Sequence, residues 1–313
     1  MSSTPISAAR SVGGGIVLSR RTMTMIALLT VYIIWSTTYL AIRFTFESFT
    51  PYLMMGIRFV IAGGLLFGFL LLRGAKLPTR RQWLSAGIVG FLLLVMGMGN
   101  TAYAETMISS GLAASLIAAS PLLTLIFSMI WGNRPKRSEW IGVGIGLLGV
   151  SVLTLEGNLQ ANPLGLVFIF VAITCWSFGS LLVKRLDMPA GAMGNAAEML
   201  IGGAILVIGA LAGGERITAA PTPGALAALV YLIVAGSLAT MTAYMYLLKN
   251  VSPALATSYA LVNPGLAVIL GVIIGGEVIT GSAFIALPLI VLGVAFVFGF
   301  FDQKVVRQIG CTL

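Results

Sequence analysis

The chain has 313 residues, of which 58% are hydrophobic and only 9% are charged, and its formal net charge is +9. This composition lies far outside the range of soluble globular domains. The sequence contains no histidine, which excludes His-dependent catalytic triads and His-containing zinc sites. The two cysteines, Cys175 and Cys311, form no metal-ligand spacing. We therefore expect an integral membrane protein without a metal or cofactor.

Apolar runs of membrane-spanning length recur along the chain. A bilayer core of about 30 Å needs roughly 20 apolar residues per helix. Runs of this kind, bounded by charges, prolines or polar clusters, predict an all-α membrane fold with tails at residues 1–23 and 302–313. The ten predicted spans are 24–42, 51–72, 83–103, 109–131, 138–155, 163–183, 189–212, 224–248, 252–275 and 281–301.

The loops on the two sides of the predicted spans differ in the sign of their predominant charge. Lysine and arginine dominate the tails and every second loop, as at Arg73, Lys76 and Arg134, whereas the opposite loops hold mainly glutamates such as Glu47 and Glu215. Short loops rich in Lys and Arg remain in the cytoplasm. Both termini are therefore predicted to be cytoplasmic, which is consistent with an even number of spans. This explanation of the basic charge requires no nucleic-acid partner.

The sequence repeats itself at a distance of about 140 residues. Each copy, 24–155 and 163–301, would contain five spans. Because five is odd, the second copy would enter the membrane from the opposite side, which gives the inverted repeats typical of transporters. The segments that match, in the same order, are 34–36 with 175–177, 58–64 with 198–204, 109–121 with 252–264 and 147–150 with 291–294.

These matches, together with the Gly-Glu-Val-Ile-Thr segment at 276–280, resemble the duplicated EamA domain of the drug/metabolite transporter superfamily. Within it the chain is similar to the YddG-type exporters of bacterial inner membranes. The resemblance implies ten helices around a central cavity and export of amino acids or related small metabolites. The first repeat departs from the pattern, because residues 132–135 read Gly-Asn-Arg-Pro, so a role for Glu277 is not mirrored there.

Ionisable and aromatic residues inside the spans are the candidates for a solute site. Arg58 and Glu198 occupy equivalent repeat positions, and either a direct pair, snorkelling of Arg58 or a helix-locking role for Glu198 would fit. Two tryptophans lie near mid-span, unlike the aromatic belts at membrane edges. They could face a cavity or pack inside the bundle, as could Tyr246. The substrate-cavity candidates are Trp35, Tyr39, Arg58, Tyr103, Ser115, Trp176, Glu198, Tyr244, Tyr259 and Asn263.

Prolines and glycines mark points of helix distortion and close packing. Pro121 and Pro264 lie at matching points of spans four and nine, and each would free a backbone carbonyl, so we predict a kink or hinge there. The motif Gly144-x-Gly146-x-x-Gly149 lies in an apolar span and is not a dinucleotide fingerprint. With Gly142, and like Gly64 and Gly68, these glycines are predicted to pack helices together.

Transport is the function that these features favour. No P-loop occurs, so the prediction is a secondary transporter that works by alternating access and is not an enzyme. Efflux of cationic drugs and a non-transporting scaffold or lipid-handling role remain alternatives. An intramembrane enzyme is disfavoured because no nucleophile with a nearby base is evident. Glu198 or Glu105 could relay protons. The expected partners are a small solute and the bilayer, with a monomer as the default state.

Overall fold

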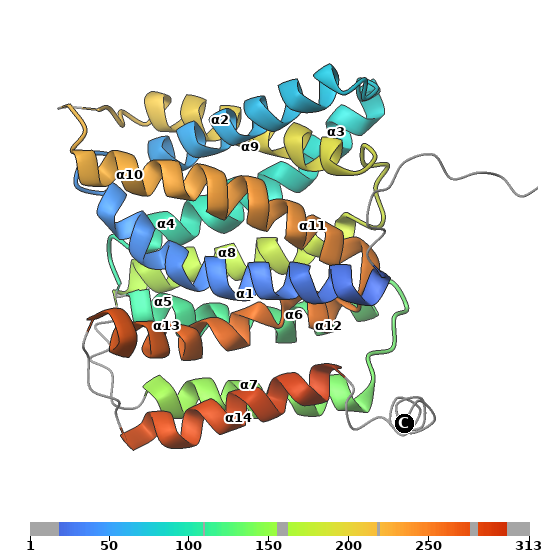
Figure 1. The fold of residues 1–313 in the computed structure, drawn as a ribbon, viewed down its shortest axis with the longest axis vertical. Helices are drawn as coiled ribbons and strands as arrows, with labels where there is room; N and C mark the ends of the chain where they lie inside the picture. Colours follow the sequence, from blue (N-terminus) through green and yellow to red (C-terminus); the bar gives the residue numbers. More distant parts are fainter. Residues whose placement is uncertain (1–18, 109, 155–161, 218–219, 276–280, 299–313) are drawn as a thin grey trace, which may run out of the picture.

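The computed structural model describes residues 19–108, 110–154, 162–217, 220–275 and 281–298, and these form helices that run roughly side by side (Figure 1). The tails and the 276–280 segment lie outside the described residues. Proline or a hydroxyl cap starts several helices, as where Ser19 accepts a hydrogen bond from the Thr22 backbone amide. The first half contains α1 (Arg20–Thr45), α2 (Pro51–Leu72), α3 (Arg80–Gly90), the π-helix η1 (Phe91–Gly99), α4 (Asn100–Ala104), α5 (Ser110–Ile117), α6 (Ser120–Met129) and α7 (Arg137–Thr154).

The second half repeats this order of elements. Its third helix also contains a π-helical segment, and its fourth is also divided into two. The elements are α8 (Pro163–Leu182), α9 (Ala192–Ala212), α10 (Pro223–Tyr231), η2 (Leu232–Ala239), α11 (Thr240–Asn250), α12 (Pro253–Thr257), α13 (Tyr259–Gly275) and α14 (Gly281–Phe298).

Seven helical stretches in the described part of the chain are long and apolar enough to cross a membrane. Three further helices, α7, α13 and α14, contact one another beside these stretches. The predicted count of ten spans includes those three and stays a prediction. The seven stretches are Arg20–Thr45, Pro51–Leu72, Arg80–Ala104, Leu112–Met129, Pro163–Leu182, Ala192–Ala212 and Pro223–Asn250.

Helices α2 and α9 pack closely through glycines. A Cβ added to Gly63 would lie 2.8 Å from the Leu200 backbone nitrogen, and one added to Gly203 would lie 2.7 Å from that of Val60. Gly56, nearer the start of α2, lies against Val207, whereas Gly63 lies against Leu200, so the two helices run in opposite directions. Close backbone approach through small residues is the usual way in which helices associate in lipid.

A second glycine contact joins α7 to α14, which lie together at the bottom of Figure 1. A Cβ at Gly142 would lie 2.5 Å from the Gly293 carbonyl oxygen, and Gly146 also packs tightly. The predicted packing role does not hold for Gly64, Gly68 and Gly144, which have no atom within 4 Å of an added Cβ. Spacing alone did not reveal which side of α2 faces another helix.

Spans four and nine are each interrupted, at positions that differ by about one helical turn in the repeat register. The break after α5 falls at residues 118–119, directly before Pro121 in the first turn of α6. Pro121 cannot donate to the Ile117 carbonyl, and the Ser120 hydroxyl donates to that oxygen at 2.7 Å. In span nine the break lies at Ser258, whereas Pro264 lies inside α13. Each span is thus two helices, and only the first break adjoins its proline.

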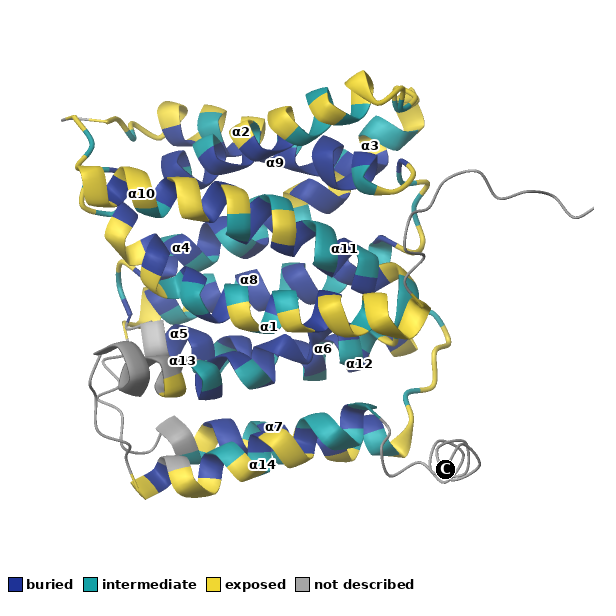
Figure 2. Ribbon diagram, in the orientation of Figure 1, coloured by how far each residue is buried: buried dark blue, intermediate teal, exposed yellow. Residues whose placement is uncertain are grey.

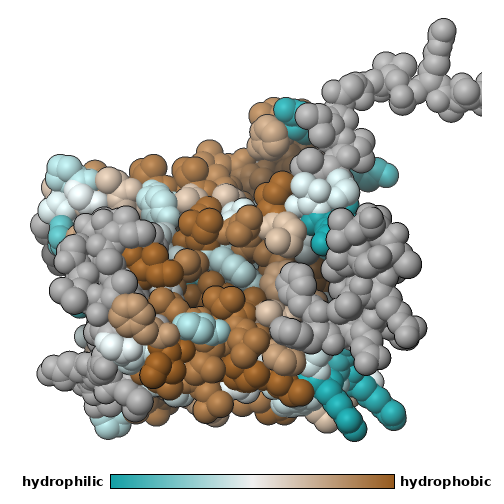
Figure 3. All heavy atoms as spheres, turned by 60° about the horizontal axis from the view of Figure 1, so that its bottom comes forward, coloured by the Kyte–Doolittle hydropathy of each residue, from teal (hydrophilic) through white to brown (hydrophobic). Residues whose placement is uncertain are grey.

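Each helix has one buried side and one exposed side. Figure 2 shows buried residues facing the interior of the bundle and exposed residues facing outward. Many of the outward residues are large and apolar, among them Leu40, Phe170 and Ile208, which are 59%, 63% and 67% exposed. Figure 3 shows the same apolar surface over the middle of one face, with hydrophilic atoms toward its ends. Such a surface suits a lipid environment.

Candidate functional site

Two π-helical segments bring backbone close to the mid-span tryptophans. η1 and η2 begin about 140 residues apart and interrupt the third helix of each half. A π-helix widens the turn, and such turns are frequent at functional sites. The indole N–H of Trp35 donates to the Gly236 carbonyl of η2 at 3.4 Å. Trp176 packs on Gly97 of η1, where a Cβ would lie 2.9 Å from Trp176 Cε3.

The two tryptophans belong to an aromatic tetrad formed by Trp35, Trp176, Tyr244 and Tyr259. These side chains come from α1, α8, α11 and α13. The ring centroids of Trp35 and Tyr259 lie 4.6 Å apart, and those of Trp176 and Tyr244 lie 5.2 Å apart in a stacked arrangement. The Tyr244 hydroxyl also shares a 2.8 Å hydrogen bond with Ser180. Edge and stacked contacts of this kind favour a defined geometry over loose packing.

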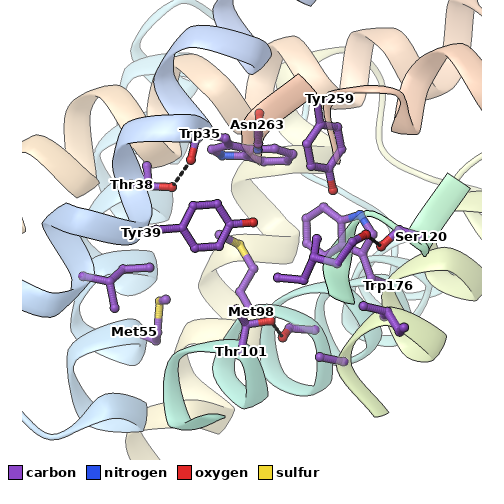
Figure 4. Close-up of a pocket in the computed structure, with 15 residues that line it drawn as sticks. Trp35, Thr38, Tyr39, Met55, Met98, Thr101, Ser120, Trp176, Tyr259 and Asn263 are labelled. Atoms are coloured by element: carbon purple, nitrogen blue, oxygen red, sulfur yellow. Dashed lines mark hydrogen bonds between the residues drawn. The ribbon is translucent and has the colours of Figure 1, made fainter. Parts of the chain in front are cut away.

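A cavity begins at this tetrad and extends between the two halves of the chain (Figure 4). It is lined from α1, α2, η1, α4, α8 and α13 and by residues around the break between α5 and α6. Its volume is about 60 Å³, enough for a few water molecules and well below the roughly 300 Å³ of a typical ligand pocket. The lining residues are Trp35, Thr38, Tyr39, Ile42, Met55, Gly97, Met98, Thr101, Ile117, Ser120, Ala172, Ile173, Trp176, Tyr259 and Asn263.

None of the described residues that line the cavity is charged. The hydroxyls of Thr38, Thr101 and Ser120 donate to carbonyls of their own chain segment, at 2.7 to 2.9 Å. By contrast, neither amide atom of buried Asn263 makes a hydrogen bond of normal geometry among the described residues, although the amide lies next to the Tyr39 hydroxyl on the same wall. An unpaired buried amide is costly unless a ligand or water completes its bonds. Asn263 is therefore the polar side chain of the cavity wall whose hydrogen bonds the described residues satisfy least.

The tetrad separates the cavity from the opposite end of the bundle. Beyond it, the Tyr32 hydroxyl and Ser258 Oγ lie 2.6 Å apart in a hydrogen bond that joins α1 to the break in span nine. The cavity extends the other way, past Tyr39 to Ile42 near the end of α1 and to Thr101 of α4. The charge pattern predicts that this second end is extracytoplasmic.

The structure places half of the ten cavity candidates on the cavity wall. Trp35, Tyr39, Trp176, Tyr259 and Asn263 line it, and their role toward a solute stays a prediction. The lining residues that sequence reasoning missed are mostly small or apolar, such as Met55 and Met98. Of the other candidates, Tyr244 lies behind the wall in the tetrad, Tyr103 stacks on Tyr52 at 5.0 Å, and Ser115, Arg58, Glu198 and the additional Tyr246 lie outside the lining.

Arg58 and Glu198 do not form the direct pair that their equivalent positions allowed. Arg58 is fully buried behind the cavity, where its Nε donates to Ser237 Oγ of η2 at 2.7 Å. Both carboxylate oxygens of Glu198 lack a hydrogen-bond partner among the described residues, and its electrostatic neighbour is Lys249 of α11. Arg58 and Glu198 lie on α2 and α9, which pack together at glycines. Their side chains nevertheless point to different neighbours.

Glu105 lies one helical turn beyond Thr101, just after α4. The side chain is 5% exposed, and neither carboxylate oxygen has a hydrogen-bond partner within the described part of the chain. Its electrostatic neighbours include Tyr39 on the cavity wall and Arg43 at the end of α1. A buried carboxyl of this kind lies close enough to influence the cavity without lining it.

An apolar helical bundle around an uncharged aromatic cavity is the arrangement of a membrane protein that handles small solutes. The sequence model of the EamA-like transporter family matches residues 22–155 and 163–299. The chain belongs to this family of transporters, which confirms the relationship predicted from the repeat.

Relatives of the chain are also named as transporters. The chain is 46% identical over 272 residues to the "Uncharacterized inner membrane transporter YedA" of Escherichia coli strain K12, covering 87% of this chain and 89% of YedA. It is 25% identical over 268 residues to the "Uncharacterized transporter YdfC" of Bacillus subtilis strain 168, covering 85% and 87%. A solved crystal structure matches with a TM-score of 0.75 at 22% identity, over 93% of this chain and 99% of the other, which shows the shared fold.

Proposed function

We propose that the protein is a secondary transporter of the bacterial inner membrane that exports amino acids or related small metabolites by alternating access. The observation that carries this proposal is the uncharged aromatic cavity between the two halves, closed at one end by the tetrad. The name of YedA, an inner membrane transporter, supports the location. Ten spans in two inverted repeats with both termini cytoplasmic complete the proposal, and the antiparallel α2–α9 contact supports it.

The cavity wall indicates the kind of solute. Aromatic faces of Trp35, Trp176 and Tyr259 would contact an apolar side chain, and the Asn263 amide would bind a polar head group. An amphipathic amino acid with an apolar side chain has both features. Because the cavity is smaller than such a solute, binding must move wall side chains, and the unbranched Met55 and Met98 can change shape with little strain.

Efflux of cationic amphiphiles is the second candidate function. The aromatic rings at the closed end of the cavity could bind an organic cation through their π faces, and no lysine or arginine lines the described wall to repel it. A zwitterionic amino acid and an organic cation would differ in their need for Asn263. The Asn263→Leu variant should therefore lose amino-acid flux more than flux of a lipophilic cation.

The test is flux into liposomes that contain only the purified protein. Labelled phenylalanine, leucine, alanine and tetraphenylphosphonium would be compared, with and without a pH gradient. We expect saturable flux of the apolar amino acids. Met98→Trp, which fills the cavity, should lower this flux at least about tenfold, the discrimination produced by a misfit of one or two methylenes.

A matched substitution distinguishes loss of the cavity from loss of folding. Met129 of α6 is 54% exposed on the apolar surface, so Met129→Trp should leave flux near the wild-type rate. Flux of no amino acid and no cation by folded wild-type protein would contradict the proposal and favour a scaffold or lipid-handling role. Equal flux in wild type and Met98→Trp would contradict the assignment of this cavity.

Coupling to protons is tested in the same liposomes. If a pH gradient drives flux, the buried Glu105 carboxyl between Tyr39 and Arg43 is the group we expect to carry the proton. Glu105→Gln should then abolish the gradient-driven part while leaving exchange of solute intact. Glu47→Gln is the control, because that carboxylate is exposed and accepts a bond from Thr222 at 3.1 Å. Gradient-driven flux that survives in Glu105→Gln would remove Glu105 from the mechanism.

A further inference from the structure

A second cavity lies at the opposite end of the bundle from the mouth of the first. It has a volume of about 430 Å³ and is lined at the ends of α6 and α8, the start of α7 and the segment between α11 and α12. The charge pattern predicts that this end faces the cytoplasm. The lining residues are Leu125, Ser128, Trp131, Asn133, Arg134, Pro135, Lys136, Glu139, Leu181, Lys184, Arg185, Val251, Ser252 and Pro253.

The lining of this cavity is strongly basic. Four lysines and arginines contribute to it, and Glu139 is the one acidic residue among the described lining. The Glu139 carboxylate is engaged inside the chain, where it accepts a hydrogen bond from the Lys136 backbone amide at 3.0 Å at the start of α7. Even without Lys136, the three cations Arg134, Lys184 and Arg185 outnumber Glu139, so the described lining carries net positive charge that favours an anion.

Two of the basic side chains are held in place by contacts within the protein. Lys184 Nζ donates to the Val251 carbonyl at 2.8 Å, and the Arg185 guanidinium lies over the Trp131 ring, 5.7 Å from its centroid. Partial burial and the neighbouring Arg185 both lower the pKa of the Lys184 ammonium. Cations that are positioned before a ligand arrives lose less freedom on binding it. An added anion would also offset the repulsion between the two cations.

Apolar residues form the other part of the lining. Leu125, Leu181, Val251 and Pro253 lie beside the basic residues and continue toward the apolar middle of the bundle. A free phosphate compound would leave this wall unused. A phospholipid would place its headgroup phosphate against the cations and the upper part of an acyl chain against the apolar residues. Basic pockets between helices on the cytoplasmic side are known to suit such headgroups.

We propose that this basic cavity binds the phosphate group of an anion at the cytoplasmic end of the bundle, with an anionic phospholipid headgroup as the ligand that fits its apolar wall. The site is separate from the transport cavity. A bound lipid would join α6, α7, α8 and the segment before α12, and would therefore stabilise the contact between these elements.

The experiment measures thermal unfolding of the purified full-length chain in detergent as a function of added ligand. The probes are a phosphatidylglycerol, a phosphatidylcholine with the same acyl chains, and inorganic phosphate. A ligand that binds the folded state raises the unfolding temperature in proportion to its occupancy. We expect a saturable rise with phosphatidylglycerol and a much smaller one with phosphatidylcholine. A saturable rise with inorganic phosphate as well would support the anion site and identify a free anion as its ligand.

Charge removal tests whether the signal comes from this cavity. Arg134→Gln should weaken the apparent affinity for phosphatidylglycerol about fivefold, and Arg134→Gln with Arg185→Gln roughly twentyfold. Arg73→Gln is the matched control, because that exposed arginine lies over the Phe69 ring at 5.0 Å, outside the cavity. No preference for phosphatidylglycerol over phosphatidylcholine, or equal affinity in wild type and Arg134→Gln, would overturn the proposal.

Discussion

The π-helical segments η1 and η2 occupy the same position in the two halves, yet they serve the site differently. η1 forms cavity wall through Gly97 and Met98. η2 contributes no lining residue; its Ser237 accepts a hydrogen bond from buried Arg58, and its Gly236 carbonyl accepts one from Trp35. The comparison shows that two repeated segments can keep the same backbone geometry while one lines the cavity and the other bonds to the side chains behind it.

The largest effect on flux is expected from a bulky side chain in η1, the π-helix that lines the cavity. A Cβ at Gly97 would lie 2.9 Å from Trp176 Cε3, so Gly97→Val should displace the indole and reduce amino-acid flux about tenfold or more. The cost in unfolding free energy should be about 1–3 kcal/mol. Gly87→Val is the control, because an added Cβ there meets only Ile201 side-chain atoms at 3.6 Å. Equal flux in the two variants would contradict the division of roles.

A smaller effect is expected on the support side, and it should appear in stability. Ser237→Ala removes the acceptor of Arg58 Nε, which should lower the free energy of unfolding by about 1.5–3 kcal/mol. Thermal or denaturant unfolding in detergent measures this change. Thr30→Ala, where the lost hydroxyl bonds only to the Ile26 carbonyl of its own helix, should cost clearly less. If Ser237→Ala instead changes the apparent affinity for solute and not stability, η2 takes part in binding.

The smallest effect compares the two tryptophans. Trp35 donates to the Gly236 carbonyl at 3.4 Å, whereas the Trp176 indole N–H makes no hydrogen bond of normal geometry in the described chain and lies beside the hydroxyls of Tyr244 and Tyr259. Trp35→Phe and Trp176→Phe lose similar ring area, so the difference between their unfolding free energies compares the Trp35–Gly236 bond with the weaker contact of the Trp176 N–H to the two tyrosine hydroxyls. We expect Trp35→Phe to be the less stable by about 0.5 kcal/mol, the lower end for one neutral bond. Equal stabilities would show that this long bond contributes nothing.

Much of the architecture could be predicted because apolar length and charge punctuation are local signals. The runs that predicted spans one, two, six and seven coincide closely with α1, α2, α8 and α9. The π-helices left no such signal, whereas Pro121, where a kink or hinge was predicted, lies directly after the break at residues 118–119. The sequence also did not show which side of each helix faces a neighbour. In α2 the contacting glycines are Gly56 and Gly63, while Gly64 faces open space.

The site was only partly predictable for the same reason. Tryptophan at mid-span is unusual enough to attract attention from sequence alone, and Trp35 and Trp176 do lie on the wall. Met55 and Met98 are ordinary apolar residues until tertiary contacts place them there. A direct pair between Arg58 and Glu198 was considered because the two residues occupy equivalent positions in the repeats. Equivalent positions do not determine where the side chains point. Their partners, Ser237 and Lys249, lie on a third helix that only the fold brings close.

The aromatic tetrad has a consequence for the ion gradient across the membrane. A membrane that stores an ion gradient cannot tolerate an open water path, because even a rare leak dissipates the stored potential. In the described part of the bundle, four rings in mutual contact lie between its two ends, with the Tyr32–Ser258 hydrogen bond beyond them. We therefore expect a bilayer that contains the resting protein to show no ionic conductance, so that the cell can keep many copies without losing its membrane voltage.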